Sequence, residues 1–159
     1  MVGLGARLRA VEGYPPESPD YYDSPRLAGW VPIQADEVVG HVALHERSAE
    51  PVMELAERVT ELPLERIGVL ARLFVAIECR RHGLARRLID ITVGESHRLG
   101  RRPILDVNIL FEPAIALYES CGWERVGEVE FRYRDTGRLL EIRSHVYVGP
   151  AVPPGPGPN

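Results

Sequence analysis

The residues best placed to do chemistry lie where an apolar run meets a short basic turn. The run over 69–77 is almost continuously apolar, as in a strand buried on both faces, and a helical pattern follows over 85–99. The main-chain amides at the start of a helix, together with its dipole, form a site for an anion. The small residues Gly83 and Ala85 would let a diphosphate approach this backbone. Positive charge would come from the basic residues Arg80, Arg81, Arg86 and Arg87. The same small residues also suit close packing of a helix on a sheet, so this segment alone leaves both interpretations open.

The basic side chains of this chain are all arginine, since the sequence contains no lysine. A phosphate-loop NTPase would lack its phosphate-binding lysine, and a Schiff-base or pyridoxal-phosphate enzyme would lack its amine. Any anion site must therefore use guanidinium groups or main-chain amides. Cys79 and Cys121 are too few for a disulfide framework or a zinc ligand set, so we expect no metal centre and two small interior residues. A catalytic thiol would require a histidine partner.

The elements that must position this turn follow from periodicity and from turn residues. β-rich segments predict one hairpin over 30–34 and 38–45, and a second over 125–133 and 139–148 around a turn at 135–137. Helical spacing with proline in the first turn predicts helices over 50–61 and 113–121. A further short buried strand is expected over 103–107. This order of strands and helices predicts a layered α/β domain with a mixed sheet.

The composition fits one soluble domain. Hydrophobic residues make up 45% of the 159, enough for a sizeable core, and 19 basic against 23 acidic residues give a formal net charge of −4. This charge disfavours a broad nucleic-acid interface. No run approaches the roughly 18 apolar residues of a membrane span, and the N-terminal residues match a secretory signal poorly, so we expect a cytoplasmic protein. We expect the domain over 1–148, with an irregular connection over 11–25, and a disordered Pro/Gly-rich tail over 149–159.

Two motifs in register resemble those of the GCN5-related N-acetyltransferase (GNAT) family. The first, Gln/Arg-x-x-Gly-x-Gly/Ala, is matched by Arg80-Arg81-His82-Gly83-Leu84-Ala85 directly after a strand. The second, Ala-x-x-Leu-Tyr-Glu-x-x-Gly-Phe/Trp, is matched by AIALYESCGW at 114–123. The resemblance covers residues 30–147 and implies the acyl-CoA N-acyltransferase fold, in which helices flank a mixed, mostly antiparallel central sheet. It also implies acetyl-CoA as cosubstrate and no metal.

The resemblance implies how the cofactor would be held. The preceding strand would pair with the pantetheine arm through the main chain of Phe74 and Val75, and Asn108 is the candidate for a further pantetheine contact. The turn would hold the CoA diphosphate beside Arg80 and Arg81, through the amides of His82, Gly83, Leu84, Ala85 and Arg86.

The resemblance also implies a direct reaction with one acid. A substrate amine would attack the bound thioester without a covalent enzyme intermediate, while main-chain amides polarise its carbonyl. Tyr118 would act as the general acid that protonates the departing thiolate. The other interpretation of Tyr118 is an aromatic ring that packs a helix against the sheet.

Three features depart from the family pattern. The strand that usually opens the family is short, shifted or missing near residues 6–11. Many members carry an asparagine three residues before the alanine of the second motif, where this chain has Phe111. No carboxylate lies in the strand over 69–77, where some members place a general base. The base therefore stays unassigned, and its candidates are Glu78, His41, His45 or a chain of water.

The sequence therefore predicts an N-acetyltransferase that moves an acetyl group from acetyl-CoA to a primary amine of a small molecule or peptide. Two alternatives stay open: a CoA-binding sensor without transfer activity, and an acetyltransferase for a protein N-terminus or an aminoacyl-tRNA, the latter disfavoured by the acidic charge. Because β-rich ends often pair between copies, we expect a homodimer. The acceptor is not identified, and the acidic residues that could receive a cationic amine are Asp20, Asp23, Glu46, Glu128 and Glu130.

Overall fold

The computed structural model describes residues 7–10, 26–80 and 83–155. Its strands are β1 (Arg7–Ala10), β2 (Arg26–Gln34), β3 (Glu37–Val38), β4 (Gly40–His45), β5 (Ile67–Val75), β6 (Arg102–Asn108), β7 (Glu124–Asp135) and β8 (Arg138–Val148). Its helices are α1 (Glu50–Thr60), α2 (Leu84–Arg98) and α3 (Glu112–Ser120), with short 3-10 helices η2 (Leu64–Arg66) and η3 (Ile77–Cys79).

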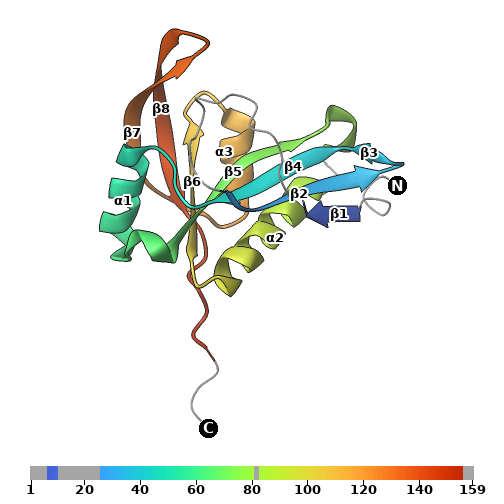
Figure 1. The fold of residues 1–159 in the computed structure, drawn as a ribbon, viewed down its shortest axis with the longest axis horizontal. Helices are drawn as coiled ribbons and strands as arrows, with labels where there is room; N and C mark the ends of the chain where they lie inside the picture. Colours follow the sequence, from blue (N-terminus) through green and yellow to red (C-terminus); the bar gives the residue numbers. More distant parts are fainter. Residues whose placement is uncertain (1–6, 11–25, 81–82, 156–159) are drawn as a thin grey trace.

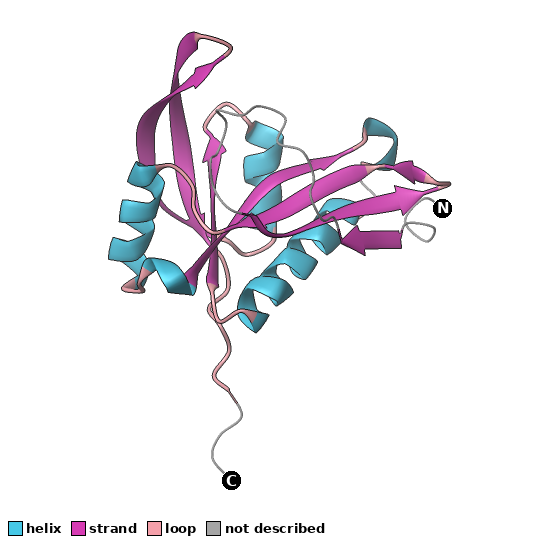
Figure 2. Cartoon of the chain, in the orientation of Figure 1, coloured by secondary structure: helices cyan, strands magenta, loops and turns pink. Residues whose placement is uncertain are grey.

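The strands form one mixed sheet in the order β1-β2-β4-β5-β6-β8-β7, with β3 paired to β2. The β5–β6 pair is parallel, and the other described pairs are antiparallel. Figure 1 shows α1 beside β7 and β8, and α2 along the β4 and β5 side of the sheet. The strands occupy the middle of the molecule and the helices lie around them (Figure 2). This arrangement confirms the predicted fold class.

Alternating side chains of the central strands supply two cores, because successive strand residues point to opposite faces. On β6, Leu105 belongs to the core covered by α2, where Leu88 is fully buried. The neighbouring Ile104 belongs to the core covered by α1, where Val52 is fully buried. Both faces of the central strands are therefore apolar, which explains why the sequence of β5 begins as a nearly continuous hydrophobic run.

The structure refines several predicted boundaries. The opening strand is present but short, and β1 pairs antiparallel with β2 from Arg7–Ile33 to Ala10–Trp30. The predicted strand over 69–77 lies two residues earlier, because the residues after Val75 form the 3-10 turn η3. The first hairpin turns at Ala35 and Asp36, whose φ values of 50° and 63° suit the two-residue turn that matches strand twist.

The C-terminal segment begins on the body of the domain. The Gly149 amide donates to the Pro103 carbonyl at 2.8 Å, and a His97 ring nitrogen donates to the Pro150 carbonyl at 2.8 Å. Residues 156–159 lie outside the described residues, so the disordered tail stays a prediction. Among the helices of the described ranges, none is both long and apolar enough to cross a membrane.

Candidate active site

The site opens where β5 leaves β6. The two strands pair only over Ile67–Val69 and Arg102–Ile104, within the described pairs. On its other edge β5 stays paired with β4, but the register shifts so that β5 carries one extra residue between Ala71 and Phe74. This bulge holds Arg72 at φ 56°, a left-handed conformation that costs a non-glycine residue about 1–2 kcal/mol. The bulge and the divergence together separate β5 from β6.

Two contacts with β4 hold this bulge in place. The Arg72 carbonyl can only accept, so Nδ1 of His41 carries a proton and donates to it at 2.9 Å. The His41 ring also stacks on Phe74, with ring centroids 5.8 Å apart. Gly40 permits the close approach of the strands, since a Cβ there would lie 2.7 Å from the Phe74 carbonyl oxygen. His41 is fully buried, so this contact is a fixed part of the strand pair.

A long cleft of about 790 Å³ runs from the end of β5, past the start of α2, to α3. Its lining contains most of the residues predicted to bind the cofactor, namely Phe74, Val75, Arg80, Gly83, Ala85 and Arg86. The predicted general acid, Tyr118, also lines it. The Leu84 side chain packs in the core covered by α2, which leaves its amide at the first turn of the helix. Arg81 and His82 lie outside the described residues.

The start of α2 is built around Gly83, the N-cap residue, at φ 77°. A Cβ at this position would meet no atom of the described residues within 4 Å, which leaves space beside it for a ligand. The Arg87 amide donates to the Gly83 carbonyl at 3.1 Å, which places the amides of Leu84, Ala85 and Arg86 ahead of the first intrahelical bond. Within the described residues, no side chain caps this end of the helix. The geometry required of an anion site is therefore present.

Two arginine side chains near the turn, those of Arg80 and Arg86, have partners within the protein. Arg86 donates to the Ser120 hydroxyl at 2.6 Å and so joins α2 to α3. Arg80 donates from Nε to the Val75 carbonyl at 3.2 Å. Arg86 was predicted to contribute both its positive charge and its amide; the contact with Ser120 directs its guanidinium to α3 and leaves the amide in place.

Tyr118 lies on α3 where the long cleft meets a second cavity, and only 7% of it is exposed. Its ring packs against Trp123 and Tyr147, with centroids 6.2 and 6.4 Å away. Burial raises the pKa of Tyr118 to about 12, and the nearby Asp106 carboxylate acts in the same direction. Tyr118 thus packs in the core, which is one of the two interpretations weighed from the sequence, and it also lines both cavities. Its role as general acid stays a prediction.

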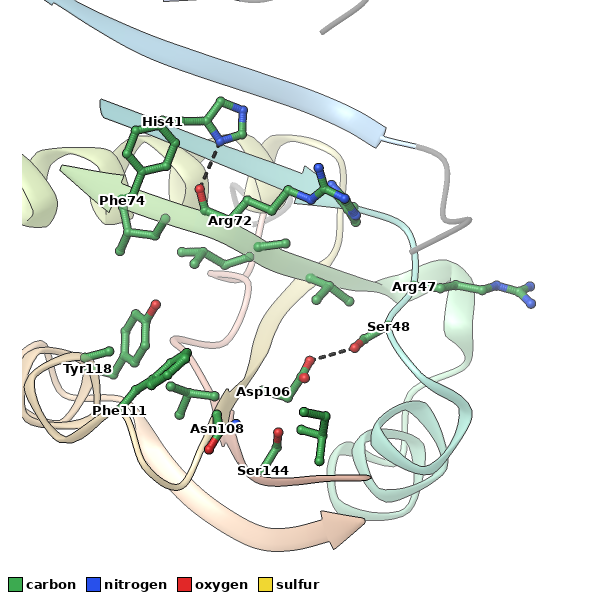
Figure 3. Close-up of a pocket in the computed structure, with 18 of the residues that line it drawn as sticks. His41, Arg47, Ser48, Arg72, Phe74, Asp106, Asn108, Phe111, Tyr118 and Ser144 are labelled. Carbon is green, nitrogen blue, oxygen red and sulfur yellow. Dashed lines mark hydrogen bonds between the residues drawn. The ribbon is translucent and has the colours of Figure 1, made fainter. Parts of the chain in front are cut away.

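The second cavity has a volume of about 350 Å³ and lies between β5 and the pair β6–β8. It shares with the long cleft the residues Leu73, Phe74, Phe111, Ala114 and Tyr118. Figure 3 shows its polar lining on two sides. His41, Arg72, Arg47 and Ser48 come from β4, β5 and the loop after β4, and Asp106, Asn108 and Ser144 come from β6 and β8 on the other side. His45, at the end of β4, also lines the cavity.

Sequence reasoning missed Asp106, Ser48 and Ser144 as lining residues of this cavity. The one usable signal was the strand period, because Asp106 and Asn108 are two residues apart on β6 and both line the cavity. Asn108 accepts the Leu110 amide at 2.9 Å through Oδ1, so its NH₂ group is the part available to a ligand.

The described acidic residues that were suggested as amine receptors, Glu46, Glu128 and Glu130, lie outside the two cavities. Glu46 pairs with Arg101 at 3.6 Å, and Glu128 and Glu130 both pair with Arg143, at 2.7 and 3.2 Å. None of the three is among the lining residues of the two cavities. Asp20 and Asp23 lie outside the described residues. The carboxylate that does face the second cavity is Asp106.

The buried side chain of His45 leads us to expect that the folded protein loses stability in acid. Burial lowers the pKa of His45 from 6.5 to about 4, and the charges of Arg72, Arg26 and His41 add to the effect. Between these two pKa values the unfolded chain binds a proton that the folded protein excludes, so stability is full above about pH 6.5 and falls as the pH drops toward 4. We expect a loss on the order of 3 kcal/mol in the free energy of unfolding, measured by urea denaturation across this range. His45→Asn should flatten the pH dependence, and equal slopes in both proteins would contradict it.

The comparisons with known proteins agree with this geometry. A family model described as the acetyltransferase (GNAT) family matches residues 6–123. Among solved structures, Arabidopsis thaliana NAA60 in complex with acetyl-CoA is 21% identical, covers 80% of this chain and 77% of its own, and has a TM-score of 0.61. A GNAT acetyltransferase from Elizabethkingia anophelis with acetyl-CoA bound is 8% identical, covers 91% and 97%, and has a TM-score of 0.61. At these identities the likeness to the structures shows the fold. The comparison with curated proteins returned no match.

Proposed function

The chain belongs to the GNAT acetyltransferase family, and from this premise we propose that it is an N-acetyltransferase that uses acetyl-CoA as its cosubstrate. The acceptor in this proposal is a primary amine of a small molecule or peptide. The similar structures from A. thaliana and E. anophelis, which hold acetyl-CoA, support the choice of cosubstrate. Within the described residues, no group of three His, Cys, Asp or Glu residues could hold a metal ion.

One observation carries the proposal: two cavities of different character meet at Tyr118. The long cleft includes the open start of α2, where a diphosphate would bind. The smaller cavity begins beyond Tyr118 and is lined by polar side chains (Figure 3). A two-substrate transfer needs such a junction, because the acyl group must meet the amine at one point.

The cofactor would lie along β5 and the start of α2. Amides of Leu84, Ala85 and Arg86 would donate to the diphosphate, joined by those of Gly83 and His82 in the same turn. Beyond Val69 the β6-facing edge of β5 has no strand partner among the described pairs, so the main chain near Phe74 and Val75 can pair with the pantetheine amides. Arg80, Arg81 and Asn108 stay predicted contacts.

In the reaction, the amine nitrogen would attack the thioester carbonyl carbon, forming the C–N bond as the C–S bond breaks. Tyr118 would donate its phenolic proton to the sulfur of the departing CoA. The lowered pKa makes His45 a poor base near neutral pH, so His41, Glu78 and water remain the candidates to take the proton of the amine. We also propose a cytoplasmic location and a homodimer, the latter testable by sedimentation.

Calorimetric titration with acetyl-CoA, followed by a screen of amines, tests this function. We expect saturable binding below millimolar ligand, and release of free CoA thiol that depends on a primary amine. No binding at millimolar acetyl-CoA would contradict the proposal. Binding without turnover of any amine or peptide would instead favour a CoA-binding sensor.

A further inference from the structure

Asp106 presents a carboxylate to the smaller cavity without a basic partner among the residues that the structure describes. Its Oδ1 accepts the Ser48 hydroxyl at 2.6 Å, the bond drawn in Figure 3. No arginine or histidine of the described ranges lies within 4.0 Å of this carboxylate to form an ion pair. Burial raises the pKa of Asp106, while the Ser48 bond and its own backbone amide oppose the rise.

A carboxylate in such surroundings is costly to keep ionised, because buried charges are normally compensated by a counter-charge. Two states satisfy this requirement. Asp106 can hold a proton and form a neutral pair with Ser48, or it can ionise when a ligand brings a cation into the cavity. The second state fits the position of the group on the wall of a cavity, where a ligand can reach it.

The position of Asp106 relative to Tyr118 defines what such a ligand would be. Figure 3 shows Tyr118 on the α3 side of the cavity and Asp106 further along β6, next to Ser48. An acceptor whose reacting nitrogen lies near Tyr118 would therefore place a different part of itself against Asp106. The cavity of about 350 Å³ is near the lower end of the range for small-molecule sites, which is about 300–1,000 Å³.

We propose that Asp106, supported by Ser48, binds a second cationic group of the acceptor, so that the acceptor is a small diamine. This inference rests on the proposed function and narrows its acceptor. The reacting nitrogen enters as the free amine and forms the C–N bond, while the distal ammonium keeps its proton and pairs with Asp106. The C–S bond of the thioester breaks, one proton passes from the attacking nitrogen to a base or to water, and the CoA sulfur receives the proton of Tyr118, so charges and atoms balance.

The opposite side of the cavity carries Arg47 and Arg72 with His41 and His45. An amino acid acceptor would direct its carboxylate to these groups. Charge compensation favours the diamine, because Asp106 forms no ion pair with an arginine or histidine of the described residues. A diamine and an amino acid of similar length, tested as acceptors side by side, distinguish these two possibilities.

The test measures kcat/KM for diaminobutane, for pentylamine of equal length, and for aminobutanoate. We expect the wild-type protein to prefer diaminobutane, and Asp106→Asn to raise the KM for diaminobutane by about 10- to 100-fold with little change for pentylamine. Ser48→Ala should act in the same direction and serves if Asp106→Asn does not fold. Asp90→Asn makes the same chemical change on the exposed side of α2 and should behave as wild type.

The outcomes separate this inference from the proposed function. Equal KM values for diaminobutane in wild type and Asp106→Asn would overturn the inference and leave Asp106 as a neutral structural partner of Ser48. Preference of the wild type for aminobutanoate would also overturn it, in favour of an anionic acceptor. In both cases acetyl-CoA turnover would persist. A wild-type protein that fails to bind acetyl-CoA would overturn the proposed function, and this inference with it.

Discussion

Replacing Tyr118 with phenylalanine is expected to lower kcat by about 10²- to 10⁴-fold, with little change in the KM for acetyl-CoA. The substitution removes the proton donor and keeps the aromatic ring that packs against Trp123 and Tyr147. Because burial raises the pKa of Tyr118 to about 12, the phenol stays protonated throughout the neutral range. The ratio of wild-type to variant kcat should therefore be constant from roughly pH 6.5 to 9. The kcat of each protein is measured at each pH from the steady-state release of CoA thiol at saturating amine.

Tyr147→Phe provides the matched control. Tyr147 is fully buried, its hydroxyl donates to Glu119 at 2.8 Å and accepts from Arg125, and it is absent from the lining of both cavities. Loss of that hydroxyl should lower the free energy of unfolding by about 1–3 kcal/mol and leave kcat within about twofold. Equal kcat in wild type and Tyr118→Phe would remove the general-acid role and leave Tyr118 as a packing residue alone.

Much of the fold was predictable because its signals are local in sequence. Gly83 ends a basic turn, and the apolar run before it and the helical period after it are each visible within about a dozen residues. The structure confirms the mixed sheet and brings most of the predicted cofactor residues into one cleft. The opening strand could not be settled from the sequence, since four residues carry too little periodicity to be distinguished from a loop.

The smaller cavity could not be predicted from the sequence, because the residues that line it are far apart in the chain. Ser48 meets Asp106 across 58 positions, from a loop whose path depends on the whole sheet. The bulge at Arg72 was equally hidden, since no glycine marks its left-handed backbone and the contact that holds it comes from His41, 31 positions away. Sequence reasoning therefore predicted the part of the long cleft that comes from the continuous segment 73–86. It missed Ser48, Asp106 and Ser144 of the smaller cavity, whose lining comes from β4 and the loop after it, β5, the β6–α3 segment, β7 and β8.

Replacing Gly83 with aspartate is expected to weaken acetyl-CoA binding by about 10³-fold. The new carboxylate would stand beside the amides of Leu84 and Ala85, where it would compete for them and repel the diphosphate. Gly83 lies at φ 77°, and aspartate tolerates this left-handed conformation better than most residues, so the protein should remain folded. Calorimetry with CoA itself, which binds without reacting, measures the change in Kd.

Two comparisons show whether the loss arises from the diphosphate. Gly137 has φ 82° in the β7–β8 turn and open space around it, so Gly137→Asp imposes the same strain and charge far from the site. It should match Gly83→Asp in stability and leave the Kd for CoA unchanged.

The second comparison uses S-acetylpantetheine, which lacks the diphosphate. Because only the diphosphate would contact the start of α2, Gly83→Asp should leave the KM for this truncated donor within about threefold of wild type. An equal loss with both donors would mean that the substitution distorts the cleft, and the assignment of the α2 amides to the diphosphate would fail.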